Sequence, residues 1–341
     1  MRRVTTLVLL SLLVLSVQAV WANGEGEATE QSPAEFYEGK TITIIEGFGA
    51  GSDFDMQARM IAPFLKELTG ARIINVDNRG GAAGLIARNY LYQQVKNDGL
   101  TIMLDHGPRL VQNGLFETEG VNYQWKEFVW IGKLLEENIL AVADKNLSWD
   151  NPKDPAEADS FIIGVSRPFY ESLIVESLGW NGAKLVPGYQ NPNERTIAIA
   201  RGEIQAAVGN TFSFTTSWDI VKPLVITFAH DDYEGVPTVR EVASPDKEKW
   251  VNYLEDFQKI QYSFIAPPGT PDDRVAFLED CLRKIYNDPD FQKKLDVMGM
   301  DKPSSFIGAE ELRASTMRLA DLSPEEIEEL RFVLQEKYVV K

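Results

Sequence analysis

Apolar runs alternate with amphipathic helical patterns along the chain, and this alternation constrains the fold more than any other feature. Short apolar strands that each lead into a helix are typical of α/β architecture with parallel strands. The first stretch predicts strand, helix, strand, helix and strand in turn at 40–45, 55–68, 73–76, 84–94 and 101–104. Gly70 is expected to stop the first helix, and the turn at Asp98 and Gly99 to precede the third strand.

The same plan repeats farther along the chain. Strands are expected at 139–143, 161–165, 184–186 and 204–208, with helices at 172–178 and 194–201. One more strand at 262–265 then leads into helices at 272–287 and 289–298. Thr270 is the expected N-cap of the first of these helices, with Pro271 at its first helical position.

The folded part, about 300 residues, is longer than one hydrophobic core usually serves, so two lobes are expected. The helices after Pro271 have no strand-rich partner of their own and are expected to pack on the first sheet. The sequence therefore predicts lobe 1 from 36–137 plus 262–341, and lobe 2 from 138–261.

The N-terminus is typical of a secretion signal. Arg2 and Arg3 precede an apolar run at 7–17, which is too short to span a bilayer comfortably, and cleavage is expected near Ala22. Residues 23–35 are polar and predict a disordered spacer. The only cysteine, Cys281, lies in a helical pattern, so we expect a buried thiol, no lipid anchor, no disulfide and no multi-cysteine metal site.

The charge balance excludes one class of partner. Without Arg2 and Arg3 the chain has 32 basic and 51 acidic side chains, a net charge of −19. This excludes nucleic acid as a partner. It also repels anions at long range, although salt screens that field beyond roughly 8 Å. Any anion site here must therefore act through local dipoles.

Two glycine-rich turns each connect a strand to a helix. The first runs from Gly47 to Asp55 and the second from Asn78 to Gly84. Small residues let backbone N–H groups approach a ligand, and a helix N-terminus adds partial positive charge, so such a turn favours an anion. An empty tight turn is the alternative, and neither turn matches a dinucleotide or Walker motif. Turns on adjacent crossovers face the same end of a sheet, where open α/β sheets bind ligands.

The motifs resemble the tripartite tricarboxylate transporter receptors, the Bug or TctC family, over nearly the whole mature chain. The string from Gly47 to Asp55, with Ala58 and Arg59, is similar to the first motif of that family. Later matches follow in the same order, except that Leu100 replaces an aromatic residue: Asn78-Arg79, Gly81-Ala82, Gly84, Asp98-Gly99, Thr101, Val186-Pro187, Tyr189, Gly202, Pro237-Thr238, Ala266-Pro267 and Gly269-Thr270-Pro271.

The resemblance implies a type II periplasmic binding protein, or Venus flytrap, with two α/β lobes around a ligand cleft. It implies a monomeric periplasmic receptor that is not an enzyme, needs no cofactor or metal, and delivers a small carboxylate to integral-membrane transporter subunits. In that family main-chain N–H groups grip the carboxylate. Carried over to this chain, the lobe 1 site is Phe48, Ala50, Gly51, Ser52, Asp55, Gly81 and Ala82.

Departures from the family pattern concern the ligand. Ser52 and Asp53 stand where small glycines are usual, so Asp53 either adds negative charge to the turn or caps the following helix. In lobe 2, Ser166 and Arg167 lie in a loop that replaces a glycine- and serine-rich one. Arg167 is either a donor fork for a distal carboxylate or a solvated surface residue.

Three more residues are candidates for the cleft. His106 follows a strand and either lines the cleft or is a hydrogen-bonded loop residue. Asn210 and Thr211 end a lobe 2 strand and are either ligand contacts or a plain strand-end turn. Two other classes of function stay open: a sensory receptor that feeds a membrane kinase, and an enzyme, although no nucleophile-elbow motif is present.

Overall fold

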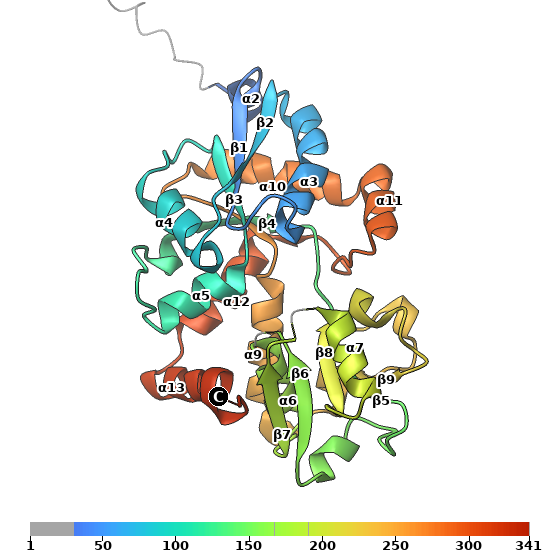
Figure 1. Cartoon of the computed structure of the whole chain (residues 1–341). Coiled ribbons are helices and arrows are strands. Elements are labelled where there is room, and N and C mark those ends of the chain that lie inside the picture. The colour runs from blue at the N-terminus through green and yellow to red at the C-terminus, as the bar shows by residue number, and fades with distance from the viewer. Residues whose placement is uncertain (1–30, 167, 190, 341) are drawn as a thin grey trace, which may run out of the picture.

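The computed structural model describes residues 31–166, 168–189 and 191–340, and these build two lobes around one sheet each (Figure 1). The predicted signal peptide, 1–22, and most of the predicted spacer, 23–35, lie outside the described residues. No helix within the described part of the chain is long and apolar enough to cross a membrane.

The first sheet has six strands in the order β11-β4-β10-β3-β1-β2. Its parallel strands are β1 (Thr41–Glu46), β2 (Ile73–Asn78), β3 (Thr101–Asp105) and β4 (Val129–Lys133), and β10 (Ser263–Ala266) and β11 (Ile307–Gly308) run antiparallel to β4. The central strands bury their branched side chains, and Ile42, Ile44 and Ile45 have no exposed surface. β1 and β2 enter the sheet in register, from Thr41 opposite Ile73 to Glu46 opposite Asn78. The carboxyl ends of β1 and β2 therefore meet at one edge.

The second sheet has five strands in the order β7-β6-β8-β5-β9. β6 (Phe161–Val165) runs parallel to β7 (Ala183–Pro187) and β8 (Ala206–Asn210), whereas β5 (Ile139–Asp144) is antiparallel to β8 and β9 (Val221–Ile226). The prediction of two α/β lobes is confirmed, but neither sheet is purely parallel. β4, β9 and the short β11 were not predicted from the sequence.

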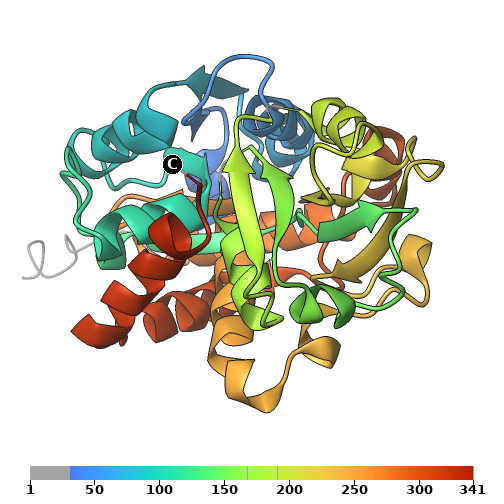
Figure 2. The ribbon, with the colours of Figure 1, turned by 60° about the horizontal axis from the view of Figure 1, so that its bottom comes forward.

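Helices cover the sheets on both sides (Figures 1 and 2). They are α2 (Pro33–Tyr37), α3 (Asp53–Thr69), α4 (Leu85–Gln93), α5 (Gly107–Leu115), α6 (Tyr170–Ser177), α7 (Pro192–Ala200), α8 (Val239–Val242), α9 (Glu248–Lys259), α10 (Asp272–Tyr286), α11 (Pro289–Met298), α12 (Ala309–Ala320) and α13 (Pro324–Phe332). α9 packs on both α6 and α12, and one apolar cluster extends from Ile45 and Met103 in the first sheet to Ile163 and Val165 in the second. The lobes therefore share a core.

Two details of the predicted C-terminal half change in the structure. The N-cap of α10 is Pro271, not Thr270, because the Thr270 hydroxyl donates to the Pro267 carbonyl (2.8 Å) instead of capping the helix. Cys281 is buried on α10, as predicted, and burial raises the pKa of its thiol to about 11.

The end of the chain lies against the second sheet, although the predicted lobe 1 includes it. Val339 pairs in parallel with Leu185 of β7, and the Tyr338 hydroxyl donates to Glu176 of α6 (2.6 Å). This C-terminal segment is red in Figure 2. The predicted lobe boundaries at 137 and 262 stay a proposal.

Candidate ligand site between the lobes

The first turn is fixed by side chains of the helix that follows it. Ser52 is the N-cap of α3, and its hydroxyl accepts from the Asp55 amide (3.2 Å). The Asp55 carboxylate accepts from the amide of Gly51 (2.8 Å), which has a left-handed φ of 83°. The Asp55 side chain therefore stabilises the turn. The sequence left open whether Asp53 caps the following helix, and in the structure the N-cap is Ser52.

The second turn holds non-glycine residues in a left-handed conformation. Ala82 and Ala83 have φ values of 46° and 52°, and Gly84 follows at 88°. Such backbone strain persists only where the surroundings impose it, and it is concentrated at functional sites. Here Arg88 donates to the Ala83 carbonyl (3.2 Å) and pairs with Asp105 (2.9 Å), with neither side chain of the pair exposed.

The two turns form one unit. The side-chain amide of Asn78, at the end of β2, donates to Asp55 (2.8 Å) and also to the buried Glu46 of β1. A hydrogen bond from Arg59 is the main cause that lowers the pKa of Asp55 to about 2, with Gly51 and Asn78 adding to it. The ionised Asp55 therefore ties both turns together.

Several backbone amides of this two-turn unit donate no hydrogen bond to any described residue. They include Ala50, Asp53 and Phe54 in the first turn, and Gly81, Ala82 and Ala83 in the second. Exposed N–H groups at a helix N-terminus and in a left-handed turn attract anions. The arrangement can therefore bind an anionic group without any cationic side chain.

A polar cluster lies where the chain crosses between the lobes. Gln261 donates through its amide to Glu137 and accepts from the hydroxyl of Tyr170, the first residue of α6. Burial, together with the carboxylates of Glu171 and Asp53, raises the pKa of Glu137 to about 7, and the hydrogen bond from Gln261 opposes that rise. This cluster was not predicted from the sequence.

The lobe 2 side of the cluster contains a buried glutamate and a buried arginine. Glu171 accepts from the amide of Phe169 (3.1 Å), and burial raises its pKa, while the charges of Arg195 and Arg109 oppose that rise. Arg195 is 6% exposed and donates to the Val208 carbonyl (2.6 Å). Its Nε has no partner among the described residues.

The remaining predicted site residues lie in different surroundings. Phe48 stacks on Phe54 with ring centroids 4.6 Å apart, and Ala50, Gly51, Gly81 and Ala82 are exposed. His106 is the N-cap of α5, and its Nδ1 accepts from the Arg109 amide (3.3 Å). Burial, with Arg109 and Arg88, lowers the pKa of His106 to about 3, so its ring is neutral.

Among the described lobe 2 candidates, Ser166, Asn210 and Thr211, no hydrogen bond to the two turns is found. The Thr211 hydroxyl donates to Asp301 (2.6 Å), and Asn210 accepts from Ser213 (2.6 Å). Thr211 and Asp301 line a pocket of about 670 Å³ between the lobes, where His230 also contacts Asp301 (3.1 Å). Ser166 is half-buried, and Arg167 lies outside the described residues.

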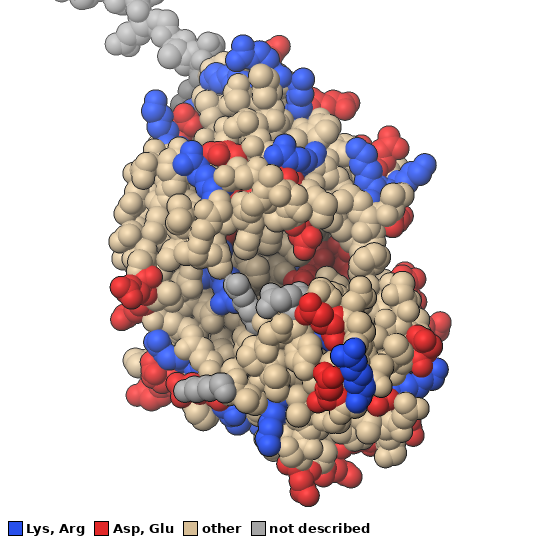
Figure 3. All heavy atoms as spheres, viewed as in Figure 1, with Lys and Arg blue, Asp and Glu red and all other residues tan. Residues whose placement is uncertain are grey.

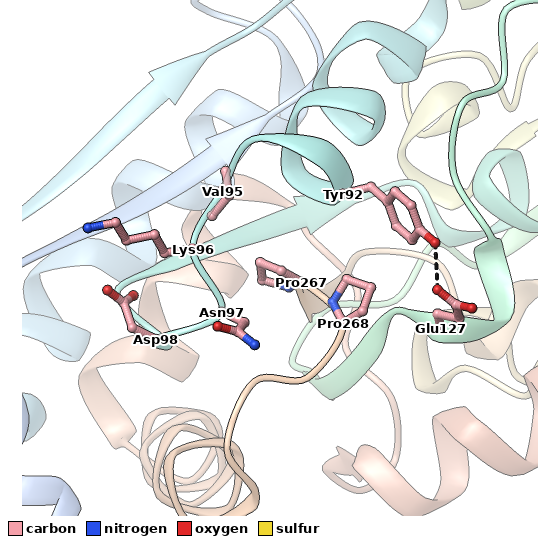
Figure 4. A pocket seen from close by; sticks show the side chains of 8 residues that line it. All are labelled: Tyr92, Val95, Lys96, Asn97, Asp98, Glu127, Pro267 and Pro268. Atoms are coloured by element: carbon pink, nitrogen blue, oxygen red, sulfur yellow. Dashed lines mark hydrogen bonds between the residues drawn. The ribbon is translucent and has the colours of Figure 1, made fainter.

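Figure 3 shows a hollow between the lobes, with acidic atoms on its wall. Another pocket, of about 520 Å³, lies in lobe 1 and is drawn in Figure 4, where Tyr92 donates to Glu127 (2.5 Å). Asp98 lines it just before β3 begins, so this pocket is at the opposite end of the sheet from the two turns. Within the described residues, no group of three or more His, Cys, Asp or Glu side chains is placed to hold a metal ion.

Comparison with known proteins defines the fold. No family model and no curated protein matches the chain. A TctC solute-binding protein from Polaromonas, solved without ligand, matches 88% of this chain and 99% of its own, at 17% identity and a TM-score of 0.69. Rpa4515 of R. palustris with adipate matches 88% and 99%, at 20% identity and 0.59. MatC from Rhodopseudomonas palustris with bound malate matches 87% and 99%, at 20% identity and 0.53.

These matches and the two-lobe topology show that the chain has the fold of a type II periplasmic binding protein. More particularly, the fold is that of the TctC solute-binding proteins, so the resemblance stated from the sequence motifs is confirmed at the level of the fold.

Proposed function

We propose that this chain is a periplasmic solute-binding receptor that captures a small carboxylate and delivers it to a membrane transporter of the tripartite tricarboxylate type. The observation that carries the proposal is the two-turn unit, in which six backbone amides without partners among the described residues meet at one edge of the first sheet. Backbone N–H dipoles carry no net charge and attract an anion only at short range. They therefore suit a protein whose formal net charge is −17, because its long-range field does not attract anions.

The solved proteins with this fold support the choice of ligand. MatC was solved with malate and Rpa4515 with adipate, and both ligands are carboxylates. In lobe 1 of this chain, the six amides are proposed to bind the carboxylate. Phe48 lies next to them, and Ser52 and Asp55 hold the first turn in place. On the lobe 2 side, Arg195 joins the residues predicted from the sequence, Ser166, Arg167, Asn210 and Thr211.

A sensory receptor for the same ligand would have the same binding site. The site therefore does not distinguish a transporter partner from a membrane kinase. Delivery to a permease is tested by uptake of a labelled ligand into cells that carry the small and large membrane subunits of the transporter. Uptake that depends on this protein supports a transport role, whereas uptake that is unchanged without it would favour the sensor.

Titration calorimetry of the mature protein with malate, adipate and succinate tests the carboxylate site, with Gly49→Val as the variant. Gly49 has no left-handed φ, and a Cβ there meets no atom within 4 Å, so valine adds bulk at the turn without straining it. Gly81→Val is less suitable, because its Cβ would be 2.4 Å from Ile86. We expect Gly49→Val to weaken the tightest of these ligands about tenfold or more. Unchanged affinity in a folded variant would place the ligand elsewhere.

A further inference from the structure

Asp301 lies in lobe 1, in the segment that connects α11 to β11, and its side chain contacts lobe 2. Its carboxylate accepts from the Thr211 hydroxyl (2.6 Å) and from the Asn138 amide (3.3 Å). The Nε2 of His230 lies 3.1 Å from its other oxygen. Asn138 directly precedes β5, Thr211 follows β8, and His230 follows β9. All the hydrogen-bond partners of this carboxylate among the described residues therefore come from the side of lobe 2.

The partners in lobe 2 are held in place by their own lobe. The Thr211 carbonyl accepts from the hydroxyl of Tyr233 (2.7 Å). The Nδ1 of His230 accepts from the Asp232 amide (3.1 Å), so the proton of the neutral ring is on Nε2, which donates to Asp301. Thr211 and His230 therefore present two fixed donors to the carboxylate.

The segment that carries Asp301 is held by lobe 1 in the same way. The hydroxyl of Tyr286, on α10, donates to the Pro303 carbonyl (2.6 Å). The amide of Met300 donates to the carbonyl of Leu295, on α11 (3.0 Å). The carboxylate of Asp301 therefore moves with lobe 1, and its donors move with lobe 2.

An apolar contact joins the lobes at the same place. Phe212 follows Thr211 in lobe 2, and its ring lies against Gly299, the C-cap of α11: a Cβ added to Gly299 would be 2.7 Å from that ring. The polar and apolar contacts lie along one pocket of about 670 Å³, which residues of both lobes line. None of these residues belongs to the apolar cluster that the two sheets share. The lobes are therefore joined here by a second set of contacts.

We propose that Asp301 is an interlobe latch, whose hydrogen bonds to Thr211 and His230 hold lobe 2 at the angle seen in this structure. A two-lobe receptor opens when one lobe rotates against the other. A rotation that separates the two lobes at this pocket has to break the bonds of Asp301. Loss of its side chain should therefore favour a more open form and let a bound solute leave faster. Only the effect on solute release rests on the proposed function, because the latch itself does not involve the solute.

Small-angle X-ray scattering of the mature protein without added solute tests the latch directly. We expect Asp301→Ala to have a larger radius of gyration than the parent protein. Asp296→Ala is the matched control, because Asp296 lines the same pocket from α11, is exposed, and makes no side-chain hydrogen bond or ion pair with any described residue. The control removes the same charge and should scatter like the parent. Identical scattering of the two variants would overturn the latch.

Thr211→Val removes one donor from the other lobe and keeps the test decisive if Asp301→Ala does not fold. It should also increase the radius of gyration, and an unchanged profile would again overturn the latch. Combined with Asp301→Ala it should add nothing further, because both changes remove the same bond.

The release of solute is measured by stopped-flow with the tightest binder among malate, adipate and succinate. Charge-assisted hydrogen bonds are the strong ones, so we expect Asp301→Ala to release it about tenfold faster, and Asp296→Ala to release it at the parent rate. Equal acceleration in both variants would mean that the charge of the pocket acts, and would overturn the latch. If none of the three acids binds, the proposed function fails, while the scattering of the solute-free protein still decides whether the latch exists.

Discussion

Gly47 lies directly against Gly84: a Cβ added to Gly47 would be 2.6 Å from the Gly84 Cα, closer than real Cβ contacts come. This backbone contact joins the turn after β1 to the turn after β2. Together with the hydrogen bonds of Asn78, it sets the spacing of the free amides that we assign to the ligand. The two glycines are thus needed so that the two turns can pack against each other, and this packing leaves open space around the amides.

Gly47→Ala should therefore destabilise the protein and weaken ligand binding together. Overpacking of this kind costs about 1–3 kcal/mol, which urea unfolding can measure. Gly49→Ala in the same turn is the control, because a Cβ there meets nothing within 4 Å. Equal stabilities for the two variants would mean that the turns can separate without cost.

Arg88→Leu should destabilise the protein strongly, because it leaves the Asp105 carboxylate buried and unpaired. Both side chains of this pair have no exposed surface. Breaking such a pair by removing one partner costs about 3–5 kcal/mol, whereas replacing both with apolar residues is often nearly neutral. We expect the double variant Arg88→Leu, Asp105→Leu to recover most of the stability. A double variant as unstable as the single one would mean that Arg88 acts mainly through the Ala83 carbonyl.

Glu137→Gln should stabilise the ligand-free protein at alkaline pH but not at acidic pH. Burial raises the pKa of Glu137 from 4.5 to about 7, so the folded state keeps a proton that the unfolded state has released. Stability from this group is therefore fully present below pH 4.5 and is lost as the pH rises to about 7. Glutamine does not ionise, so its advantage should grow between those values and reach about 2 °C in Tm or more at pH 8. A constant difference from pH 4 to 8 would contradict the buried acid.

Local patterns were enough to predict most of the parallel strands and the helices between them. The helix at 289–298 has the predicted bounds, and β6 has those of the strand predicted at 161–165. β4 and β9 were missed because neither stands beside a helix pattern of its own. The cap of α10 was misplaced by one residue, since the Thr270 hydroxyl found a carbonyl partner that only the folded loop provides.

The site was predictable only in part. Glycine-rich turns after β1 and β2 are visible in the sequence, but the left-handed backbone of Ala82 and Ala83 is not, because alanine rarely adopts it. The cluster at the crossing joins Glu137 to Gln261 across 124 residues of sequence, and no local pattern indicates such a pair. Two adjacent acids, Glu136 and Glu137, at the expected lobe boundary were the one available signal.

The most direct test of the proposed two-turn ligand site is an NMR titration that follows the backbone amides. The mature protein, labelled with ¹⁵N, is titrated with succinate and L-aspartate. We expect the largest amide shifts on Ala50, Asp53, Phe54, Gly81, Ala82 and Ala83, because these amides have no partner among the described residues before the ligand binds. Large shifts confined to the pocket around His230 and Asp301, with the two turns unchanged, would contradict it.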